Sequence, residues 1–309
     1  MTLYDASPRF GRVITAMVTP FDYAGALDLD AAVELAQWLA AHGSDGLVLT
    51  GSTGESSVLT DDEKSDLWRA VAEAVTIPVI AGSGSNDTEH SIKMTALAAE
   101  CGVDGVLLVT PYYNRPSQAG IAEHFRAVAA AAGDLPAILY DVPPRTGRRI
   151  ATSTVLQLAR EVPNIVALKD AASDPAGTAH LAAQVPPGFE IYSGDDVMTL
   201  PFMSVGAIGV ISITAHWVAP QLRQVIDAFL AGDLATAITT NAELLDSFDF
   251  SSSEAYPNPL PAKAMCRAMG LAVGQCRLPM GPSTPELDAM AAKVLAAVGP
   301  PASTGQPLA

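Results

Sequence analysis

One lysine stands alone at the end of an apolar segment. The stretch from Asn164 to Asp170 reads NIVALKD, so that Lys169 follows four apolar residues. An ammonium group in such surroundings is poorly solvated and loses its proton more easily than a free lysine, which makes Lys169 a candidate amine nucleophile for a carbonyl carbon. The alternative is a structural ion pair between Lys169 and Asp170. The chain has five lysines, and the other four lie in segments predicted to be surface helices: Lys64, Lys93, Lys263 and Lys293.

Polar residues also follow other apolar segments, and each group has a structural interpretation. The Gly-Ser-Thr-Gly sequence is typical of a tight turn, and it lacks the Gly-Lys-Ser/Thr ending of a Walker loop. The paired tyrosines are compatible with a core or an interface, and the paired aspartates with a helix cap. The five histidines are too scattered for a metal site, which disfavours a metal-dependent aldolase. The polar segments are Thr50–Glu55, Thr110–Pro116, Tyr140–Gly147, Gly194–Asp196 and Ser212–His216.

The elements that would position these residues alternate between strands and helices. The expected strands are continuous apolar runs without polar alternation, as in parallel strands buried on both faces. We expect strands at Arg12–Val18, Gly46–Thr50, Ile77–Ala81, Gly105–Val109, Ala137–Tyr140, Ile165–Lys169, Glu190–Ser193 and Ile208–Ile211. We expect helices between them at Asp30–Ala41, from Thr60 onward, and at Asn86–Cys101, Ser117–Ala132, Thr152–Val162, Asp174–Val185 and Asp196–Val205.

The alternation predicts an α/β fold, a (β/α)8 TIM barrel with a helical C-terminal extension. An open doubly wound sheet is the alternative, because periodicity does not show closure. Only helical segments follow Ile211, and we expect the barrel over residues 1–225 and the extension over residues 226–309. In such barrels the active site lies at the carboxyl ends of the strands, where the polar segments stand. The extension helices are expected at Gln221–Ala231, Leu234–Phe248, Ala262–Met269 and Pro285–Val298, before a frayed tail at Pro300–Ala309.

Composition excludes several other classes of protein. No apolar run is long enough to span a bilayer, so we expect no membrane segment. The N-terminus lacks the features of a signal peptide, and three cysteines do not make a disulfide framework, which favours the cytoplasm. A formal charge of −16 opposes the phosphate contacts of nucleic-acid binding.

Taken together, the segments closely resemble the 4-hydroxy-tetrahydrodipicolinate synthases, within the class I pyruvate-dependent lyase and synthase superfamily. The resemblance covers nearly the whole chain. It implies condensation of pyruvate with aspartate semialdehyde in lysine and diaminopimelate biosynthesis, with no cofactor and no metal. The motifs that carry it are Gly51–Glu55, Thr110–Pro116, Tyr140–Gly147, Lys169, Ser193–Asp196, Gly209–Ser212, Asn258–Lys263 and Arg277–Met280.

The resemblance also implies roles for single residues. Lys169 would form the Schiff base with pyruvate, and Tyr140 would be the acid/base nearest to the imine. Thr53 would be a bridging hydroxyl and Tyr113 the far end of a proton relay. The backbone N–H groups of Ser52 and Thr53 would receive the carboxylate of pyruvate. Arg145 would hold the carboxylate of the second substrate, and the carbonyl of Ile211 would be a further contact.

Three residues depart from the pattern of many relatives and leave the substrate open. Asp141 stands where many have Asn, Asp170 where they often have Glu, and His216 where they often have Asn. One alternative is a sister aldolase acting on a 2-oxo sugar acid or a hydroxy-oxoacid, although Arg145 to Gly147 resembles the synthase branch. A non-catalytic small-molecule sensor is a second alternative, disfavoured by the presence of all four proposed catalytic residues.

The resemblance further implies a homotetramer, with a dimer as its minimum, in which Tyr113 reaches the neighbouring subunit's site. Many relatives bind lysine in a cleft at the subunit interface. In lysine-sensitive relatives a glutamate that faces the α-ammonium of the ligand stands in the place of His90. We therefore expect weak feedback by lysine. The matching positions are Ser56, Ser57, Asp61, Lys64, Asn86, His90 and Tyr112.

Overall fold

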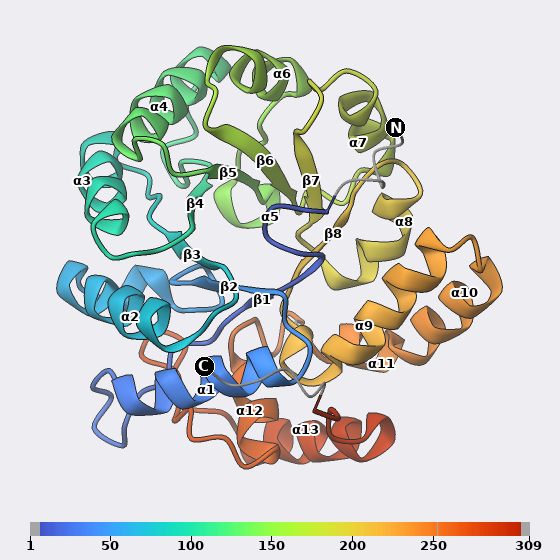
Figure 1. The fold of residues 1–309 in the computed structure, drawn as a ribbon. Coiled ribbons are helices and arrows are strands. Elements are labelled where there is room, and N and C mark those ends of the chain that lie inside the picture. The colour runs from blue at the N-terminus through green and yellow to red at the C-terminus, as the bar shows by residue number, and fades with distance from the viewer. Residues whose placement is uncertain (1–6, 252, 304–309) are drawn as a thin grey trace.

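The computed structural model describes residues 7–251 and 253–303, and its centre is a closed barrel of eight parallel strands (Figure 1). Neighbouring strands pair in the order of the chain, and β8 pairs with β1. This closure confirms the predicted barrel and excludes the open sheet. The strands are β1 (Val13–Ala16), β2 (Gly46–Leu49), β3 (Val79–Gly82), β4 (Gly105–Val109), β5 (Ala137–Asp141), β6 (Ile165–Asp170), β7 (Glu190–Ser193) and β8 (Gly209–Ser212).

Helices surround the barrel, in agreement with the predicted alternation. Two short elements, at Ser56–Val58 and Pro143–Thr146, were not expected. The run Pro143–Pro144 is typical of a turn, yet prolines fit the first positions of a helix because their missing N–H has no partner there. The predicted helix at Asp196–Val205 is a 3₁₀ turn followed by a short helix. The elements are α1 (Leu29–Ala41), η1 (Ser56–Val58), α2 (Asp61–Ala74), α3 (Thr88–Ala99), α4 (Gln118–Ala131), α5 (Pro143–Thr146), α6 (Thr152–Glu161), α7 (Pro175–Ala182), η2 (Asp196–Met198) and α8 (Thr199–Met203).

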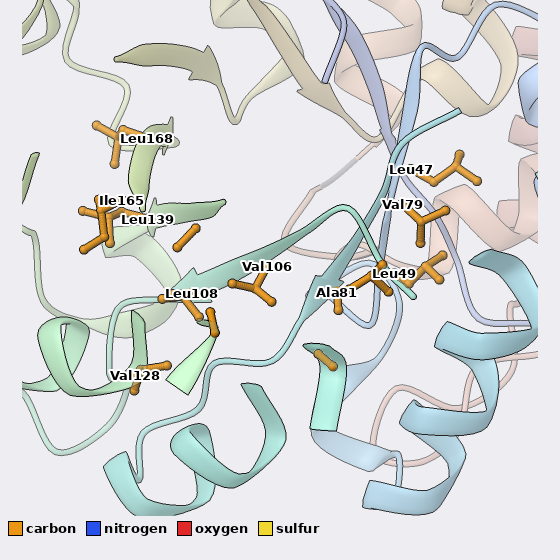
Figure 2. Packing of buried hydrophobic residues seen from close by; sticks show 14 of the residues in the cluster. Leu47, Leu49, Val79, Ala81, Val106, Leu108, Val128, Leu139, Ile165 and Leu168 are labelled. Carbon is orange, nitrogen blue, oxygen red and sulfur yellow. The ribbon is translucent and has the colours of Figure 1, made fainter. Parts of the chain in front are cut away.

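The side chains of each strand point alternately into the barrel and toward the helices. Leu139 and Leu168 belong to the apolar layer between strands and helices (Figure 2). Tyr140 belongs instead to the cluster inside the barrel. In the register of β5 and β6, Tyr140 lies opposite Lys169, and the next pair is Asp141 opposite Asp170. This alternation directs the tyrosine and the lysine inward and the two aspartates outward.

The C-terminal helices pack beside the barrel around a third apolar cluster, which joins them to β1 and β8. The predicted helix at 234–248 is two helices. The proposed domain boundary at residue 225 falls inside α9 and stays a prediction, as does the frayed tail, part of which lies outside the described residues. No helix among the described residues is long and apolar enough to cross a membrane. The extension helices are α9 (Ala215–Leu230), α10 (Leu234–Glu243), α11 (Leu245–Ser251), α12 (Leu260–Ala268) and α13 (Pro285–Val298).

Candidate active site

Lys169 lies near the carboxyl end of β6 with 6% of its surface exposed. Burial lowers the pKa of its ammonium group to about 8, which the carboxylate of Asp196 opposes and the guanidinium of Arg145 favours. The lysine stem packs beside Gly194, where an added Cβ would lie 3.0 Å from Cγ of Lys169. A larger residue at position 194 would therefore crowd the lysine stem and Ala171.

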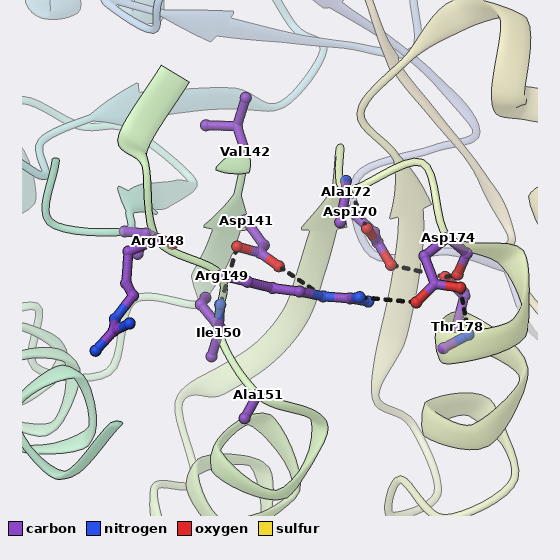
Figure 3. A network of polar contacts seen from close by, with 12 residues as sticks. Asp141, Val142, Arg148, Arg149, Ile150, Ala151, Asp170, Ala172, Asp174 and Thr178 are labelled. Carbon is purple, nitrogen blue, oxygen red and sulfur yellow. Dashed lines mark hydrogen bonds and ion pairs between the residues drawn. The ribbon is translucent and has the colours of Figure 1, made fainter. Parts of the chain in front are cut away.

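The ion pair between Lys169 and Asp170, which was the structural alternative, is not among the ion pairs of the described residues. The carboxylate of Asp170 points to the opposite side of β6. It accepts hydrogen bonds from the N–H of Ala172 at 3.0 Å and from the hydroxyl of Thr178 at 2.7 Å (Figure 3). The amine of Lys169 is thus left facing the inside of the barrel.

The ring of Tyr140 lies against the amine of Lys169, with Nζ 4.3 Å from the ring centroid. Burial raises the pKa of the phenol, whereas the Arg145 charge and a hydrogen bond with Ser52 act in the opposite direction. The phenol therefore holds its proton at neutral pH and has a hydroxyl beside it. This contact places a proton donor next to the candidate nucleophile.

The loop after β2 brings its two hydroxyls to different partners. The Ser52 side chain contacts Tyr140. The hydroxyl of Thr53 instead accepts a hydrogen bond of 2.9 Å from Nδ2 of Asn258. The prediction that Thr53 is the bridging hydroxyl receives no support from these contacts, and Ser52 is better placed for that role. The sequence singled out Ser52 for its backbone N–H only.

A cavity of about 260 Å³ opens beside these residues. Tyr140 and Ser52 line it, as do Arg145 from α5 and Tyr112 from the loop after β4. Tyr113 is 89% exposed, whereas Tyr112 is half-buried, and the φ of Tyr113, 70°, lies in the left-handed region. Tyr113 therefore does not join the other predicted site residues within this chain. Ile211, on β8, is buried among the residues inside the barrel.

Asp196 is a buried carboxyl that the sequence suggested only as a helix cap. It accepts hydrogen bonds from the hydroxyl of Ser212 and from the N–H groups of Ile213 at 3.0 Å and Thr214 at 3.1 Å. These bonds fix the carboxyl, whose charge acts on Lys169. Asp196 thus ties the loop after β7 to the loop after β8; burial raises the pKa of its carboxyl, and these hydrogen bonds oppose that shift.

His216, which stands where relatives often have Asn, has two hydrogen-bond partners. Nε2 accepts a bond of 3.2 Å from the N–H of Val18, and Nδ1 lies 2.7 Å from the carbonyl of Ile213. Burial lowers the pKa of the ring to about 4, so that it is neutral at pH 7. His216 therefore links the ends of β1 and β8 as a structural group.

Two lysines predicted to lie on surface helices are buried, which corrects the sequence analysis. Lys263 is completely buried, and its Nζ lies 2.7 Å from Oε1 of Glu55 and 4.0 Å from the ring centroid of Phe21. Lys64 is 8% exposed. Helical patterning does not reveal the burial of Lys263, because Glu55 and Phe21, which contact it, come from distant parts of the chain.

The outer side of β5 and β6 carries a network of charged groups behind Tyr140 and Lys169 (Figure 3). Arg149 lies between two carboxylates, with Nη1 2.7 Å from Asp174 and Nε 3.8 Å from Asp141. Burial raises the pKa of Asp141 to about 7, and the neighbouring Asp170 raises it further, whereas a hydrogen bond from the N–H of Ile150 lowers it. The guanidinium of Arg149 therefore lies among three carboxyl groups, those of Asp141, Asp170 and Asp174.

A closed barrel with a buried lysine against a tyrosine, at the carboxyl ends of its strands, is typical of lyase-type barrel enzymes. The chain belongs to the dihydrodipicolinate synthetase family, whose model it matches over residues 9–298. This confirms the predicted family.

Comparisons with individual relatives agree. The 4-hydroxy-tetrahydrodipicolinate synthase of Symbiobacterium thermophilum is 49% identical over 294 residues, which cover 94% of this chain and 99% of the relative. The enzyme of Cyanidioschyzon merolae, solved with lysine bound, is 42% identical with a TM-score of 0.92, covering 94% of this chain and 99% of that one. The enzyme of Acinetobacter baumannii, solved with pyruvate, is 35% identical with a TM-score of 0.87, covering 94% and 99%. These relatives support the synthase rather than the sister aldolase.

Proposed function

We propose that this chain condenses pyruvate with L-aspartate 4-semialdehyde to give 4-hydroxy-tetrahydrodipicolinate, as relatives of this name do. The observation that carries the proposal is the buried amine of Lys169 against the ring of Tyr140. A lysine whose pKa is near 8 has an appreciable fraction of free amine at neutral pH. The amine can therefore attack a ketone without a cofactor.

In the proposed reaction the amine of Lys169 adds to C2 of pyruvate, and loss of water gives the imine. Loss of a proton from the methyl carbon then gives an enamine, which forms a carbon–carbon bond with the aldehyde. The amino group of the second substrate closes the ring on the imine carbon and releases Lys169. Protons move through Tyr140 and the adjacent hydroxyl of Ser52, which takes the bridging role first expected of Thr53.

The two substrate carboxylates go to different groups in this proposal. Backbone N–H groups of Ser52 and Thr53 receive the carboxylate of pyruvate. The guanidinium of Arg145, which lines the cavity, receives the carboxylate of the aldehyde. The carbonyl of Ile211 is a further contact at the end of β8. A sister aldolase would need groups matched to sugar hydroxyls at the place of Arg145.

We propose a cytoplasmic homotetramer in which Tyr113 completes the relay in a neighbouring subunit. The high exposure of Tyr113 supports this assignment, because the phenol faces away from its own chain. The algal relative was solved with lysine bound. For this chain we propose a weak response to lysine, since His90 is engaged with Asp61.

One experiment tests the reaction. Pyruvate consumption is measured with aspartate semialdehyde and, in parallel, with a panel of sugar-acid and hydroxy-oxoacid substrates. We expect turnover with aspartate semialdehyde and little with the panel. Preferred turnover of a panel substrate would instead establish the sister aldolase.

A further inference from the structure

Asn258 reaches the active site from the C-terminal extension. It lies between α11 and α12, is 2% exposed and lines the same cavity as Tyr140 and Arg145. The resemblance to known synthases singled out the motif that begins with Asn258 but gave this residue no role. Its contacts join two parts of the site that are far apart in sequence.

The side chain of Asn258 holds the loop after β2. Its Nδ2 donates a hydrogen bond of 2.9 Å to Oγ1 of Thr53, and this bond is buried. An amide nitrogen only donates, so the Thr53 hydroxyl must direct its own proton elsewhere. The bond therefore fixes the side chain of Thr53 and with it the backbone proposed to receive the carboxylate of pyruvate.

The backbone of Asn258 holds the arginine. Its carbonyl accepts a hydrogen bond of 3.1 Å from Nη2 of Arg145. A guanidinium has five N–H donors, so this bond leaves the others available to a substrate carboxylate. One residue thus contacts both groups to which the two substrate carboxylates are assigned.

A second contact anchors the same segment. Lys263, at the start of α12, lies 2.7 Å from Glu55, and both side chains are 2% exposed or less. The other oxygen of Glu55 accepts a bond of 2.9 Å from the N–H of Arg277. The extension therefore contacts the loop after β2 at both Thr53 and Glu55. These two contacts limit how far Asn258 can move.

We propose that Asn258 is a positioning residue, which sets the loop that receives pyruvate and the arginine that receives the aldehyde relative to each other. This inference rests on the proposed function. Asn258 acts through Thr53 and Arg145 and performs no chemical step itself. Removal of its side chain should weaken pyruvate binding most and aldehyde binding less, because the carbonyl that contacts Arg145 remains, while Lys169 still forms the imine at high pyruvate concentration.

The test is a double-mutant cycle of Asn258→Ala and Thr53→Val. For each variant, borohydride trapping of pyruvate on Lys169 gives the half-saturating pyruvate concentration, and steady-state rates give KM for the aldehyde. Each single variant should raise the half-saturating pyruvate concentration about tenfold. The half-saturating concentration of the double variant should lie within about twofold of that of the more impaired single variant. Asn258→Ala keeps the backbone carbonyl that Arg145 contacts, so KM for the aldehyde should rise less than the half-saturating pyruvate concentration does.

Two controls separate positioning from stability. Thr53→Ser keeps the acceptor and should recover most of the affinity that Thr53→Val loses. Asn164→Ala removes a half-buried amide whose Nδ2 donates to the carbonyls of Ala129, Gly133 and Leu135, away from the site. It should lower Tm and leave both substrate constants unchanged.

Additive losses of pyruvate affinity in the double variant would overturn the proposal. So would an Asn258→Ala variant that, like Asn164→Ala, has a lower Tm and unchanged substrate constants. The trapping measurement needs pyruvate only, so it still tests Asn258 if the wild-type enzyme fails to use aspartate semialdehyde. A wild-type enzyme that traps no pyruvate overturns the proposed function and this inference together.

Discussion

At the scale of single residues, Lys169 and Lys263 are both buried, but their contacts give them different properties. Lys263 lies 2.7 Å from Glu55, and its Nζ donates to the carbonyl of Gln275 at 2.9 Å. Lys169 has an aromatic ring beside it instead, and Asp196 acts on it without an ion pair being formed. Burial lowers the pKa of Lys263 as well, but its amine is engaged with a carboxylate and a carbonyl, so the reactive amine should be that of Lys169.

This difference predicts which lysine reacts and how the reaction depends on pH. With a pKa of about 8 rather than 10.5, roughly one tenth of Lys169 is free amine at pH 7. Borohydride with pyruvate should trap an adduct on Lys169, at an initial rate that rises to about pH 8 and levels off above it. Peptide mapping checks the site, with Lys169→Ala as the control. An adduct on Lys263, or a rate that does not change with pH, would show that the amine has been misassigned.

Arg145 provides a second prediction at this scale. Arg145→Ala should lower kcat/KM for the aldehyde by roughly ten- to a hundredfold, because a hydrogen bond to a charged group contributes about 1.5–3 kcal/mol. It should affect the pyruvate imine much less. The variant should also shift the pH profile of trapping upward, since the guanidinium lowers the pKa of Lys169. Equal losses in both half-reactions would mean that Arg145 does not distinguish the two carboxylates.

At the scale of elements, the apolar segments of the sequence predicted most strands and helices. The eight strands were found in order because continuous Val, Ile and Leu segments are typical of strands covered on both sides. Their ends were less accurate: the run Arg12–Val18 is longer than β1, since only its middle residues pair with neighbouring strands. Long-range contacts could not be predicted. The burial of Lys263 and the bond from Asn258 to Thr53 depend on the packing of the extension against the barrel.

The network behind β5 and β6 gives a prediction about stability. The pKa of Asp141 is raised to about 7, so the folded protein keeps a proton that the unfolded chain releases above about pH 4. The contribution of this group is thus fully present at low pH and is lost as the pH rises through about 7. Asp141→Asn keeps the acceptor for the N–H of Ile150 and removes the charge. Compared with wild type, the variant should gain more free energy of unfolding at pH 8 than at pH 5, by up to a few kcal/mol.

Denaturant unfolding of wild type and variant at both pH values measures this effect. Asp174→Asn is the matched control in the same network. A backbone bond from Gly177 and the contact with Arg149 lower the pKa of Asp174, so its contribution is present above the unfolded pKa and is lost in acid. Asp174 is ionised in both the folded and the unfolded state between pH 5 and pH 8, so Asp174→Asn should leave the stability difference between these pH values nearly unchanged, whereas Asp141→Asn should reduce it. Parallel changes would contradict the assignment of the titrating carboxyl to Asp141.

At the scale of the whole molecule, one barrel carries most of the proposed site but leaves Tyr113 outside it. Its exposure and its left-handed backbone could not be predicted from the sequence, because they depend on the loop after β4. The resemblance to the family, rather than any local pattern, suggested that this tyrosine serves another subunit. The site of an isolated chain would then lack the far end of its relay.

Subunit mixing tests this assignment. Tyr113→Phe subunits keep Lys169, and Lys169→Ala subunits keep Tyr113, so a mixed oligomer should contain some sites with both groups. We expect each variant alone to be nearly inactive and the mixed oligomer to recover part of the activity. Mass spectrometry confirms mixing. If verified mixed oligomers recover no activity, Tyr113 acts in its own chain.

The cavity beside the candidate active site also concerns regulation by lysine. Ser56, Ser57 and Tyr112, three of the positions that match the lysine cleft of relatives, line the cavity described above. Asp61 is the acidic residue among the matching positions, and both of its oxygens are engaged: Oδ1 lies 2.8 Å from Nε2 of His90, and Oδ2 lies 3.0 Å from Nζ of Lys93. These contacts lower the pKa of Asp61. The carboxylate is therefore ionised but already has cationic or hydrogen-bonding partners.

An incoming α-ammonium would have to displace one of these partners, and it would meet His90 where lysine-sensitive relatives are expected to offer a glutamate. Lys64, close to Asp61, adds a positive charge that repels the α-ammonium of the ligand. A partly enclosed cleft screens such repulsion weakly. We expect little inhibition at millimolar lysine. His90→Glu restores the anionic partner and should make the enzyme more sensitive, whereas Lys93→Ala, which only frees one oxygen of Asp61, should have a smaller effect. Rates titrated with lysine measure both, and saturable inhibition of the wild type well below the millimolar range would mean that Asp61 exchanges its partners for the ligand.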